Sequence, residues 1–140
     1  MIDIETRVID QIYKSISAEY PKAVIENRYT ESASEFPFIA VYEQNNSNAT
    51  RYEEFSDGEL YNNLVYEVQI FTNDKLKKKT AKAIAQIVDE EMRTMGFSRS
   101  FMNPIPNIDR TIYRIAMRYT AIVQNPTLAQ TDNTIYLYHT

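Results

Sequence analysis

Two groups of acidic residues are the side chains in this sequence that could most readily perform chemistry. One group is residues 89–91, and the other consists of Glu53, Glu54, Asp57 and Glu59. Paired carboxylates bind Mg²⁺ or exchange protons with a substrate. Consecutive residues on a helix do not share a face, however, and the second group matches no known metal-binding loop. We therefore expect ion pairs between Asp89 and Lys82 or Arg93, and a solvated or partner-binding loop around Asp57.

The residues that usually carry nucleophilic catalysis or bind transition metals are scarce. The 140-residue chain has no cysteine, and its one histidine is His139. Serine, threonine and tyrosine are plentiful, but a nucleophile relay needs a base such as histidine beside the hydroxyl. There are only two glycines, so we expect no phosphate-cradling loop. The sequence predicts no catalytic residue, no metal, no cofactor and no small-molecule substrate.

Lysines gather at the start of a helix predicted at residues 75–95. They are Lys75, Lys77, Lys78, Lys79 and Lys82. Positive charge at a helix N-terminus opposes the helix dipole, at a cost of about a few tenths of a kcal/mol per residue. One interpretation is a contact with an anion or an acidic surface, either nucleic acid or a neighbouring subunit. The other is an ordinary solvated polar face.

A second basic feature lies on the longest predicted strand, residues 108–124. Arg110, Arg114 and Arg118 are four residues apart. On a strand they would share one face at intervals of about 13 Å, and this spacing predicts a basic stripe. The stripe is either the solvated side of a sheet or a surface that meets the acidic part of the next subunit.

Charge is distributed unevenly along the chain, whose net charge is −4. Residues 1–67 contain thirteen acidic and five basic residues, whereas residues 68–140 contain six and ten. The two parts therefore carry about −8 and +4. This asymmetry is either a chance of composition or the mark of a subunit with two oppositely charged faces. The second interpretation suits head-to-tail packing in a ring.

Hydrophobic periodicity predicts the elements that position these side chains. Helices are expected at residues 3–17, capped by Asp3, and at residues 75–95, ended by Gly96. Strands are expected at residues 23–27, 36–43, 60–72 and 108–124, with further candidates at 50–55 and 134–138. Residues 44–48 predict a turn or loop, residues 56–59 predict a turn, and residues 97–102 fit no single element. The order predicts one α+β domain over residues 1–140: a mainly antiparallel sheet of about four to five strands with two helices on one face.

The membrane is not an expected partner. No apolar run approaches the roughly 18 residues that a membrane-spanning helix needs. The N-terminal residues also lack the basic and apolar segments of a signal peptide. We expect the protein to remain in the cytoplasm where it is made until something else incorporates it.

The order of several motifs resembles a known family. An amphipathic helix precedes EFPFIAVYEQNNS (residues 35–47), an acidic turn region and LVYEVQIFTND (residues 64–74). A lysine-rich segment then leads into AKAIAQIVDEEMRTMGF (81–97), NPIPNIDRTIYRIAMRYTAIVQ (103–124) and a final TIYL (134–137). From about Asp3 to Leu137, this order resembles the small tail-completion (tail terminator) and head–tail joining proteins of long-tailed bacteriophages and prophages.

The resemblance implies a structural protein of the virion with an α+β fold and no catalytic site. Such proteins form rings, commonly hexameric, that cap the tail tube, stop its growth and provide the surface for joining the head. The implied partners are further copies of the chain, the tail tube protein and a head-completion or connector protein. The implied location is the head–tail interface of the virion, and the host cytoplasm before assembly.

We expect the contacts in such an assembly to come from the charged segments and from the C-terminal tail, residues 127–140. The residues predicted to touch a neighbouring subunit or partner are Lys77, Lys78, Lys79, Arg110, Arg114, Arg118, Glu53, Glu54, Asp57 and Tyr136. Tyr136 lies in the short β-prone segment, which we expect to add a strand to a neighbour.

Three alternatives to a tail terminator remain open at this point. The closest is a head–tail connector or adaptor ring. A nucleic-acid-associated module would use the lysines and the arginine stripe, and its DNA binding would weaken with salt. A metal-assisted enzyme would use the carboxylates near Asp57 or Asp89 and would bind a metal tightly.

Overall fold

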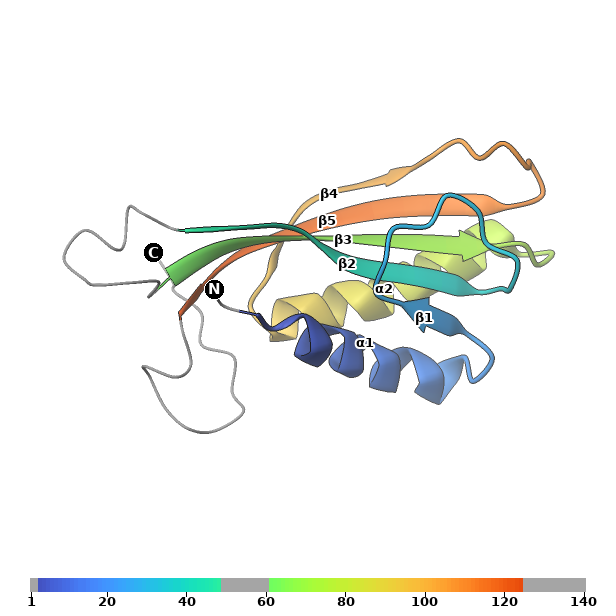
Figure 1. The fold of residues 1–140 in the computed structure, drawn as a ribbon. Helices are drawn as coiled ribbons and strands as arrows, with labels where there is room; N and C mark the ends of the chain where they lie inside the picture. Colours follow the sequence, from blue (N-terminus) through green and yellow to red (C-terminus); the bar gives the residue numbers. More distant parts are fainter. Residues whose placement is uncertain (1–2, 49–60, 125–140) are drawn as a thin grey trace.

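The computed structural model of the chain describes residues 3–48 and 61–124 (Figure 1). Within these residues the chain forms two helices and five strands. In order they are α1 (Glu5–Glu19), β1 (Val24–Glu26), β2 (Phe38–Asn48), β3 (Tyr61–Thr72), α2 (Lys77–Thr94), β4 (Ser98–Pro104) and β5 (Tyr113–Gln124). The predicted α+β class is confirmed.

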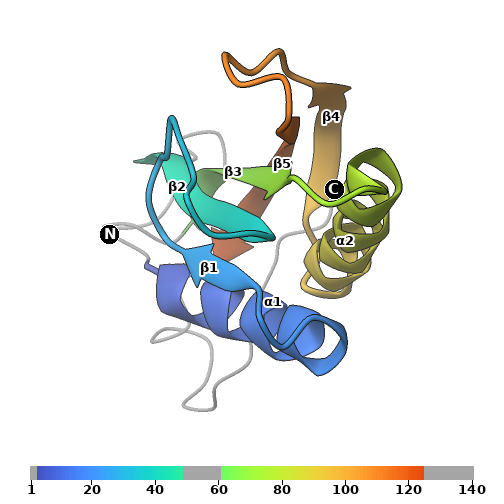
Figure 2. The same ribbon diagram turned by 90° about the vertical axis from the view of Figure 1, so that its right-hand side faces the viewer.

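The described strands form one sheet in the order β1-β2-β3-β5-β4. The short β1 runs parallel to β2, whereas the other three neighbouring pairs are antiparallel. Both helices lie on the same side of this sheet, as the two views in Figures 1 and 2 show. The predicted mainly antiparallel sheet with both helices on one face is therefore confirmed.

The main core lies between the helices and the sheet, because side chains alternate between the two faces of a strand. On β3, the side chains of Leu64, Tyr66, Val68 and Ile70 are fully buried against the helices. The other elements contribute Ile115, Met117, Tyr119 and Val123 from β5, Val8, Ile12 and Ile16 from α1, and Ile84, Val88 and Met92 from α2. Burial of each large aliphatic side chain contributes about 1.5–3 kcal/mol, so this layer supplies most of the driving force for folding.

The strand β2 is buried on both faces where it begins. Ile39 and Val41 face the helices, whereas Phe38 and Ala40 pack with Phe71 on the opposite side of the sheet. Phe38 and Phe71 meet edge to face, with 5.9 Å between their ring centroids. Because of this second small core, the face of the sheet opposite the helices is not entirely exposed to solvent.

The predicted turn or loop at residues 44–48 is wrong. β2 continues to Asn48, with an irregularity in pairing between Glu43 and Asn45. The neighbouring strand supplies the hydrogen bonds that a turn would have supplied locally; the Asn62 amide, for example, donates to Asn46 Oδ1 at 2.7 Å. Tertiary pairing has therefore overridden the local preference of this amide-rich segment.

The end of α2 follows the sequence prediction. Gly96 has a φ of 95°, in the left-handed region that glycine adopts without steric cost. The Phe97 N–H donates to the Met92 carbonyl and the Gly96 N–H to the Arg93 carbonyl, each at 2.9 Å. These two bonds cap the helix in a Schellman motif and turn the chain into β4.

The beginnings of the helices differ from the predictions. Ile4 and Leu76 occupy the N-cap positions, and neither makes a side-chain cap. Asp3 instead accepts a hydrogen bond from the Glu5 N–H at 3.1 Å, just before the helix. The hydrophobic period predicts an apolar face of this helix that includes Leu76 and Ala83, and the face in the structure is rotated from it. Ala81 is buried instead of Ala83, and Leu76 is 63% exposed.

Candidate subunit-contact surface

The start of α2 and the residues just before it place five lysines at one end of the molecule. The first turn of the helix is joined to the end of β3, because the Thr72 hydroxyl donates to the Lys77 carbonyl at 2.7 Å. Asp74 adds a second constraint, since its carboxylate accepts a hydrogen bond from the Thr80 hydroxyl at 2.8 Å. The backbone that carries the lysines is thus anchored to the sheet, while their side chains extend from the surface.

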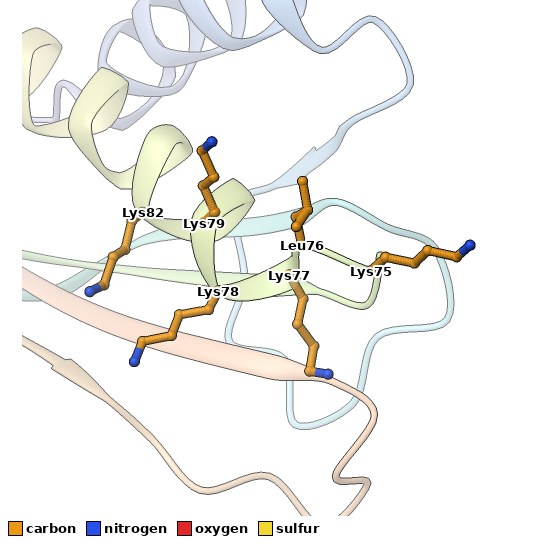
Figure 3. Close-up of a pocket in the computed structure, with 6 residues that line it drawn as sticks. All are labelled: Lys75, Leu76, Lys77, Lys78, Lys79 and Lys82. Carbon is orange, nitrogen blue, oxygen red and sulfur yellow. The ribbon is translucent and has the colours of Figure 1, made fainter.

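These lysines line an open hollow of about 540 Å³ (Figure 3). The lining residues are Lys75, Leu76, Lys77, Lys78, Lys79 and Lys82. Figure 3 shows Lys78 and Lys82 extending from the helix toward β5 and β4, while Lys75 and Lys79 point in other directions. Within the part of the chain that the structure describes, no ammonium group of this set pairs with a carboxylate.

A second hollow, of about 340 Å³, adjoins the first along the edge of the sheet. Lys78 and Lys82 belong to both hollows, and the second is completed by Met102, Pro104, Tyr113 and Ile115. Met102 is 40% exposed here, and Leu76 is 63% exposed in the first hollow. Together the two hollows form an apolar groove rimmed by positive charge, which we call the lysine groove.

The local electrostatics of the lysine groove oppose folding. The first turn of α2 contains no acidic residue, and its lysines lie at the positive end of the helix dipole. The like charges also repel one another along the same turn. Folding alone does not explain this arrangement, and departures of this kind concentrate at functional sites.

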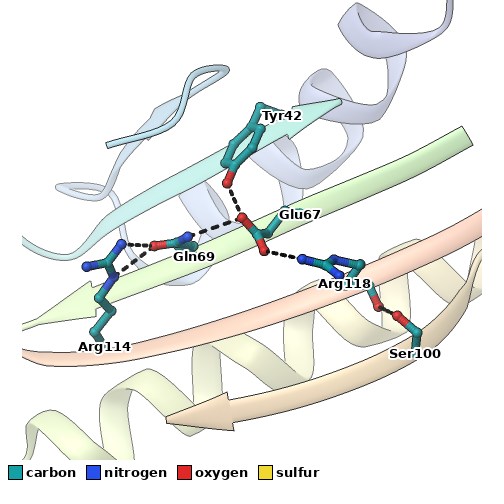
Figure 4. A network of polar contacts seen from close by, with 6 residues as sticks. All are labelled: Tyr42, Glu67, Gln69, Ser100, Arg114 and Arg118. Atoms are coloured by element: carbon teal, nitrogen blue, oxygen red, sulfur yellow. Dashed lines mark hydrogen bonds and ion pairs between the residues drawn. The ribbon is translucent and has the colours of Figure 1, made fainter. Parts of the chain in front are cut away.

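The predicted arginine stripe does not form. Arg110 lies in the turn before β5, which begins at Tyr113, so it is exposed and is not part of the strand. Arg114 and Arg118 do share one face of β5, but both are engaged within the protein (Figure 4). Arg110 is missing from the stripe because the strand begins five residues later than the sequence pattern indicates, whereas Arg114 and Arg118 bind partners on β3.

Glu67 is at the centre of the network that engages Arg118. The residue is buried, with 8% of its surface exposed. Its carboxylate accepts hydrogen bonds from Tyr42, from the Gln69 amide at 3.2 Å and from Arg118 Nη2 at 3.2 Å. Burial, together with the neighbouring Glu67 carboxylate, raises the pKa of the Tyr42 hydroxyl above its usual value. Tyr42 therefore stays protonated and remains a donor to Glu67.

Arg114 extends the same network toward the far end of the sheet. Its Nε donates to the Gln69 side-chain oxygen at 2.8 Å, and a second guanidinium nitrogen donates to the same oxygen. Both arginines also stack on aromatic rings: Arg114 on Phe71 and Arg118 on Phe101, each 4.8 Å from the ring centroid. The positive charges on this face are thus largely satisfied within the fold.

The carboxylates of α2 have structural partners. Asp89 Oδ2 pairs with Arg93 Nε at 2.8 Å, as predicted, and Asp89 Oδ1 with Arg99 Nη1 at 3.3 Å. The Tyr119 hydroxyl also donates to Asp89, at 2.8 Å. The predicted alternative, a pair between Asp89 and Lys82, is absent from the described residues. Arg99 could not be identified as a partner from the sequence, because its segment matched no single element.

Glu91 holds the two helices together. Its carboxylate accepts hydrogen bonds from the Ser15 hydroxyl at 2.6 Å and from the Gln11 amide at 2.8 Å, both on α1. Asp89 and Glu91 therefore point to different sets of partners, as expected for nearby residues on different helix faces. Among the residues that the structure describes, no cluster of three acidic or histidine side chains could hold a metal ion.

A smaller polar cluster lies where α1 begins. The Glu43 carboxylate accepts hydrogen bonds from the Tyr66 hydroxyl at 3.3 Å and the Asn46 amide at 3.4 Å. Burial, and secondarily the negative charge of Glu5, raises the pKa of Glu43. Glu5 in turn accepts a hydrogen bond from the Glu43 N–H at 2.9 Å. The cluster joins the first helix to the sheet at the end away from the lysine groove.

Four of the residues predicted to make contacts lie outside the described part of the chain. They are Glu53, Glu54, Asp57 and Tyr136. Lys77, Lys78 and Lys79 are brought together in the lysine groove, with Lys77 half-buried and the other two exposed. Sequence reasoning missed the apolar floor of this groove, because Leu76 was assigned to the core of α2. The signal that could have found it is the position of Leu76 among lysines before the first helical turn.

The comparisons with known proteins gave no match, either to a protein-family model or to a curated protein. A search of the described helices for a membrane span also gave a negative result, since neither is long and apolar enough to cross a bilayer.

Proposed function

We propose that this protein is a non-enzymatic assembly subunit of a phage or prophage virion. It forms a ring that terminates the tail tube and joins the tube to the head. The observation that carries the proposal is the lysine groove: an anchored cluster of positive charge, without an ion pair among the described residues, beside exposed apolar side chains. Such a surface is suited to binding a macromolecule with complementary charge. The motif order described above supports the choice of a tail terminator among such assemblies.

The fold supports this proposal through the distribution of its polar groups. Arg118 pairs with Glu67 across the sheet, Arg99 of β4 pairs with Asp89 of α2, and the Glu91 carboxylate accepts a hydrogen bond from Ser15 of α1. The lysines of the groove are left available to a partner. The partners we propose are further copies of the chain, the tail tube protein and a head-completion or connector protein.

The deciding experiment mixes the purified protein with isolated tail tubes and with polymerising tube protein. We expect rings at one end of the tubes in negatively stained electron micrographs, and an arrest of tube growth. Light scattering behind a sizing column measures the size of the assembly in parallel. Tubes that stay uncapped and continue to grow at saturating protein concentration would overturn the tail-terminator proposal.

A head–tail connector ring is the nearest alternative, and the same lysine groove could serve it. A connector would bind the head and leave growth of the tail tube unaffected. Adding the protein to tail-less heads distinguishes the two functions, because only a connector is expected to bind them without a tail tube.

A nucleic-acid-associated module is the second candidate that a specific observation favours, because lysines without an ion pair in the described part of the chain also suit a phosphate backbone. The hydrogen bonds that Arg114 and Arg118 make within the fold count against it, since they leave fewer donors of these two arginines for phosphates. Binding of labelled duplex DNA at low salt, with an affinity that falls steeply as salt rises, would support this function. An absence of binding at low salt would remove it.

A further inference from the structure

The lysine groove restricts the chemistry of whatever binds it. Its rim is positive, so the ligand must carry negative charge, and its floor contains the exposed side chains of Leu76 and Met102. A phosphate backbone would satisfy the rim but leave the floor uncovered. A peptide that combines carboxylates with aromatic side chains would satisfy both, because aromatic burial adds apolar area.

A segment of this composition exists in the chain itself. Residues 51–60 read RYEEFSDGEL, with four carboxylates, one basic residue and two aromatic residues. The carboxylates are Glu53, Glu54, Asp57 and Glu59, and the aromatic residues are Tyr52 and Phe55. We call residues 49–60 the acidic segment. It lies outside the described residues, so only its sequence and its points of attachment enter the inference.

Those points of attachment are at the wrong end of the molecule for contact within one subunit. The acidic segment joins Asn48 on β2 to Tyr61 on β3, and the lysine groove begins beyond Thr72, where β3 ends. Figure 1 shows these two ends of β3 on opposite sides of the molecule. A strand rises about 3.3 Å per residue, so the two ends are roughly 36 Å apart.

The length of the acidic segment limits how far it can extend. Its middle residues are about six residues from an anchor, and a fully extended chain covers at most about 3.4 Å per residue. The segment can therefore reach roughly 20 Å from the end of the sheet, whereas Lys78 and Lys79, in the first turn of α2, lie near the opposite end of β3, roughly 36 Å away. The acidic segment and these two lysines can therefore meet only between two copies of the chain.

We propose that the lysine groove binds the acidic segment of a second copy of this chain. The inference rests on the function proposed above, and it names the contact that builds the ring. Because the groove of one subunit meets a different surface of the next, the contact is heterologous, and heterologous contacts close into rings when the rotation permits. The contact between the charged groups at its rim is weakened by salt.

A charge-exchange experiment tests this contact. The groove variant carries Lys78→Glu and Lys79→Glu, and the segment variant carries Glu53→Lys and Glu54→Lys. Alone, each variant places like charges against one another and is expected to be a monomer by light scattering. In an equal mixture, the altered groove of one variant faces the altered segment of the other, and the unchanged groove faces the unchanged segment. Opposite charges then meet at both contacts, and we expect an oligomer of wild-type mass in which the two variants alternate.

The matched control reverses two exposed lysines elsewhere, Lys14→Glu and Lys22→Glu, and is expected to assemble as the wild type does. Circular dichroism of every variant establishes that the fold is retained. An oligomer of wild-type mass formed by the folded groove variant alone would overturn the inference. So would a mixture of the two folded variants that stays monomeric, or a wild-type protein that stays monomeric at every concentration.

The tube-capping experiment separates this inference from the proposed function. If the folded groove variant still forms rings that cap tail tubes, the function stands and this contact is refuted. If the mixture of variants restores the oligomer but neither it nor the wild type caps tubes, the contact stands and the tail-terminator function fails. If the groove variant loses only DNA binding and assembles normally, the groove belongs to nucleic acid and the inference is overturned.

Discussion

Replacing Glu67 by glutamine tests whether the arginine network around it stabilises the fold or serves a contact between subunits. The substitution keeps the size of the side chain and removes its charge. The glutamate accepts hydrogen bonds from three groups: the Tyr42 hydroxyl, the Gln69 amide and the Arg118 guanidinium. The amide of glutamine has a single acceptor oxygen, and its nitrogen would face another donor. At least one of the three bonds must therefore be lost.

The expected loss of stability follows from that count. A hydrogen bond that involves a charged group contributes about 1.5–3 kcal/mol. The side chain of Arg118 is 37% exposed, so water compensates part of its loss. We therefore expect Glu67→Gln to lower the free energy of unfolding by about 2 kcal/mol. With an unfolding entropy of about 2.1 cal/mol/K per residue and 140 residues, this corresponds to a Tm about 7 °C lower.

The assay is thermal unfolding followed by circular dichroism, with light scattering on the same samples at 25 °C. Glu90→Gln is the matched control, because Glu90 is exposed on α2 and surface substitutions usually change stability by less than about 0.5 kcal/mol. We expect Glu67→Gln to unfold earlier and to assemble as the wild type does. A Tm equal to that of the control, together with a lost oligomer, would show that this network serves a partner and not the fold.

Three further predictions concern separate parts of the chain. Glu43→Gln should stabilise the protein at pH 7, because burial raises the folded-state pKa of Glu43 above its ordinary 4.5 and its ionised form opposes folding. The wild type should then regain stability relative to this variant as the pH falls through the raised pKa toward 4.5. A difference in urea midpoint between the two proteins that stays the same at every pH would contradict this. Gly96→Ala should lower stability by about 1–2 kcal/mol, because alanine pays a steric cost at positive φ; an unchanged urea midpoint would refute this. Deletion of residues 127–140 should weaken self-association, and an unchanged mass on a sizing column would rule out a contact by the C-terminal tail.

Periodicity was sufficient to predict the fold wherever burial decided the structure. The alternation from Leu64 to Ile70 and the spacing of Ile84, Val88 and Met92 identified the strand and helix that form the core. Gly96 marked the end of α2, because few other residues adopt its backbone conformation at low cost. In these places the local preference and the tertiary packing agree.

The predictions failed where pairing between distant residues decided the structure. The amides at residues 44–48 have the composition of a turn, but β3 lies beside them and completes their hydrogen bonds. Arg114 and Arg118 looked like a surface stripe, because nothing in the local sequence shows that Glu67 and Gln69 on β3 lie opposite them. The register of the sheet contains this information, and a single segment does not.

Pairing within the fold also determines which positive charges remain available to a partner. Arg93, Arg99 and Arg118 pair with carboxylates, and Arg114 binds an amide. The planar guanidinium suits these fixed, directional bonds, whereas a lysine ammonium is a flexible and strongly hydrated point charge. The net charge of +4 in residues 68–140 counts arginines and lysines equally. As a contact surface, the lysines contribute more than this count suggests and the arginines contribute less.

A contact made by lysines should tolerate different substitutions from a contact made by arginines. Because an ammonium group offers charge without a fixed geometry, Lys78→Arg and Lys79→Arg should preserve any assembly that depends on the groove. Removal of the charge by Lys78→Gln and Lys79→Gln should weaken that assembly and reduce its dependence on salt. If the groove contributes through its apolar floor alone, glutamine and arginine should be tolerated equally, and substitution of Leu76 should be the damaging change.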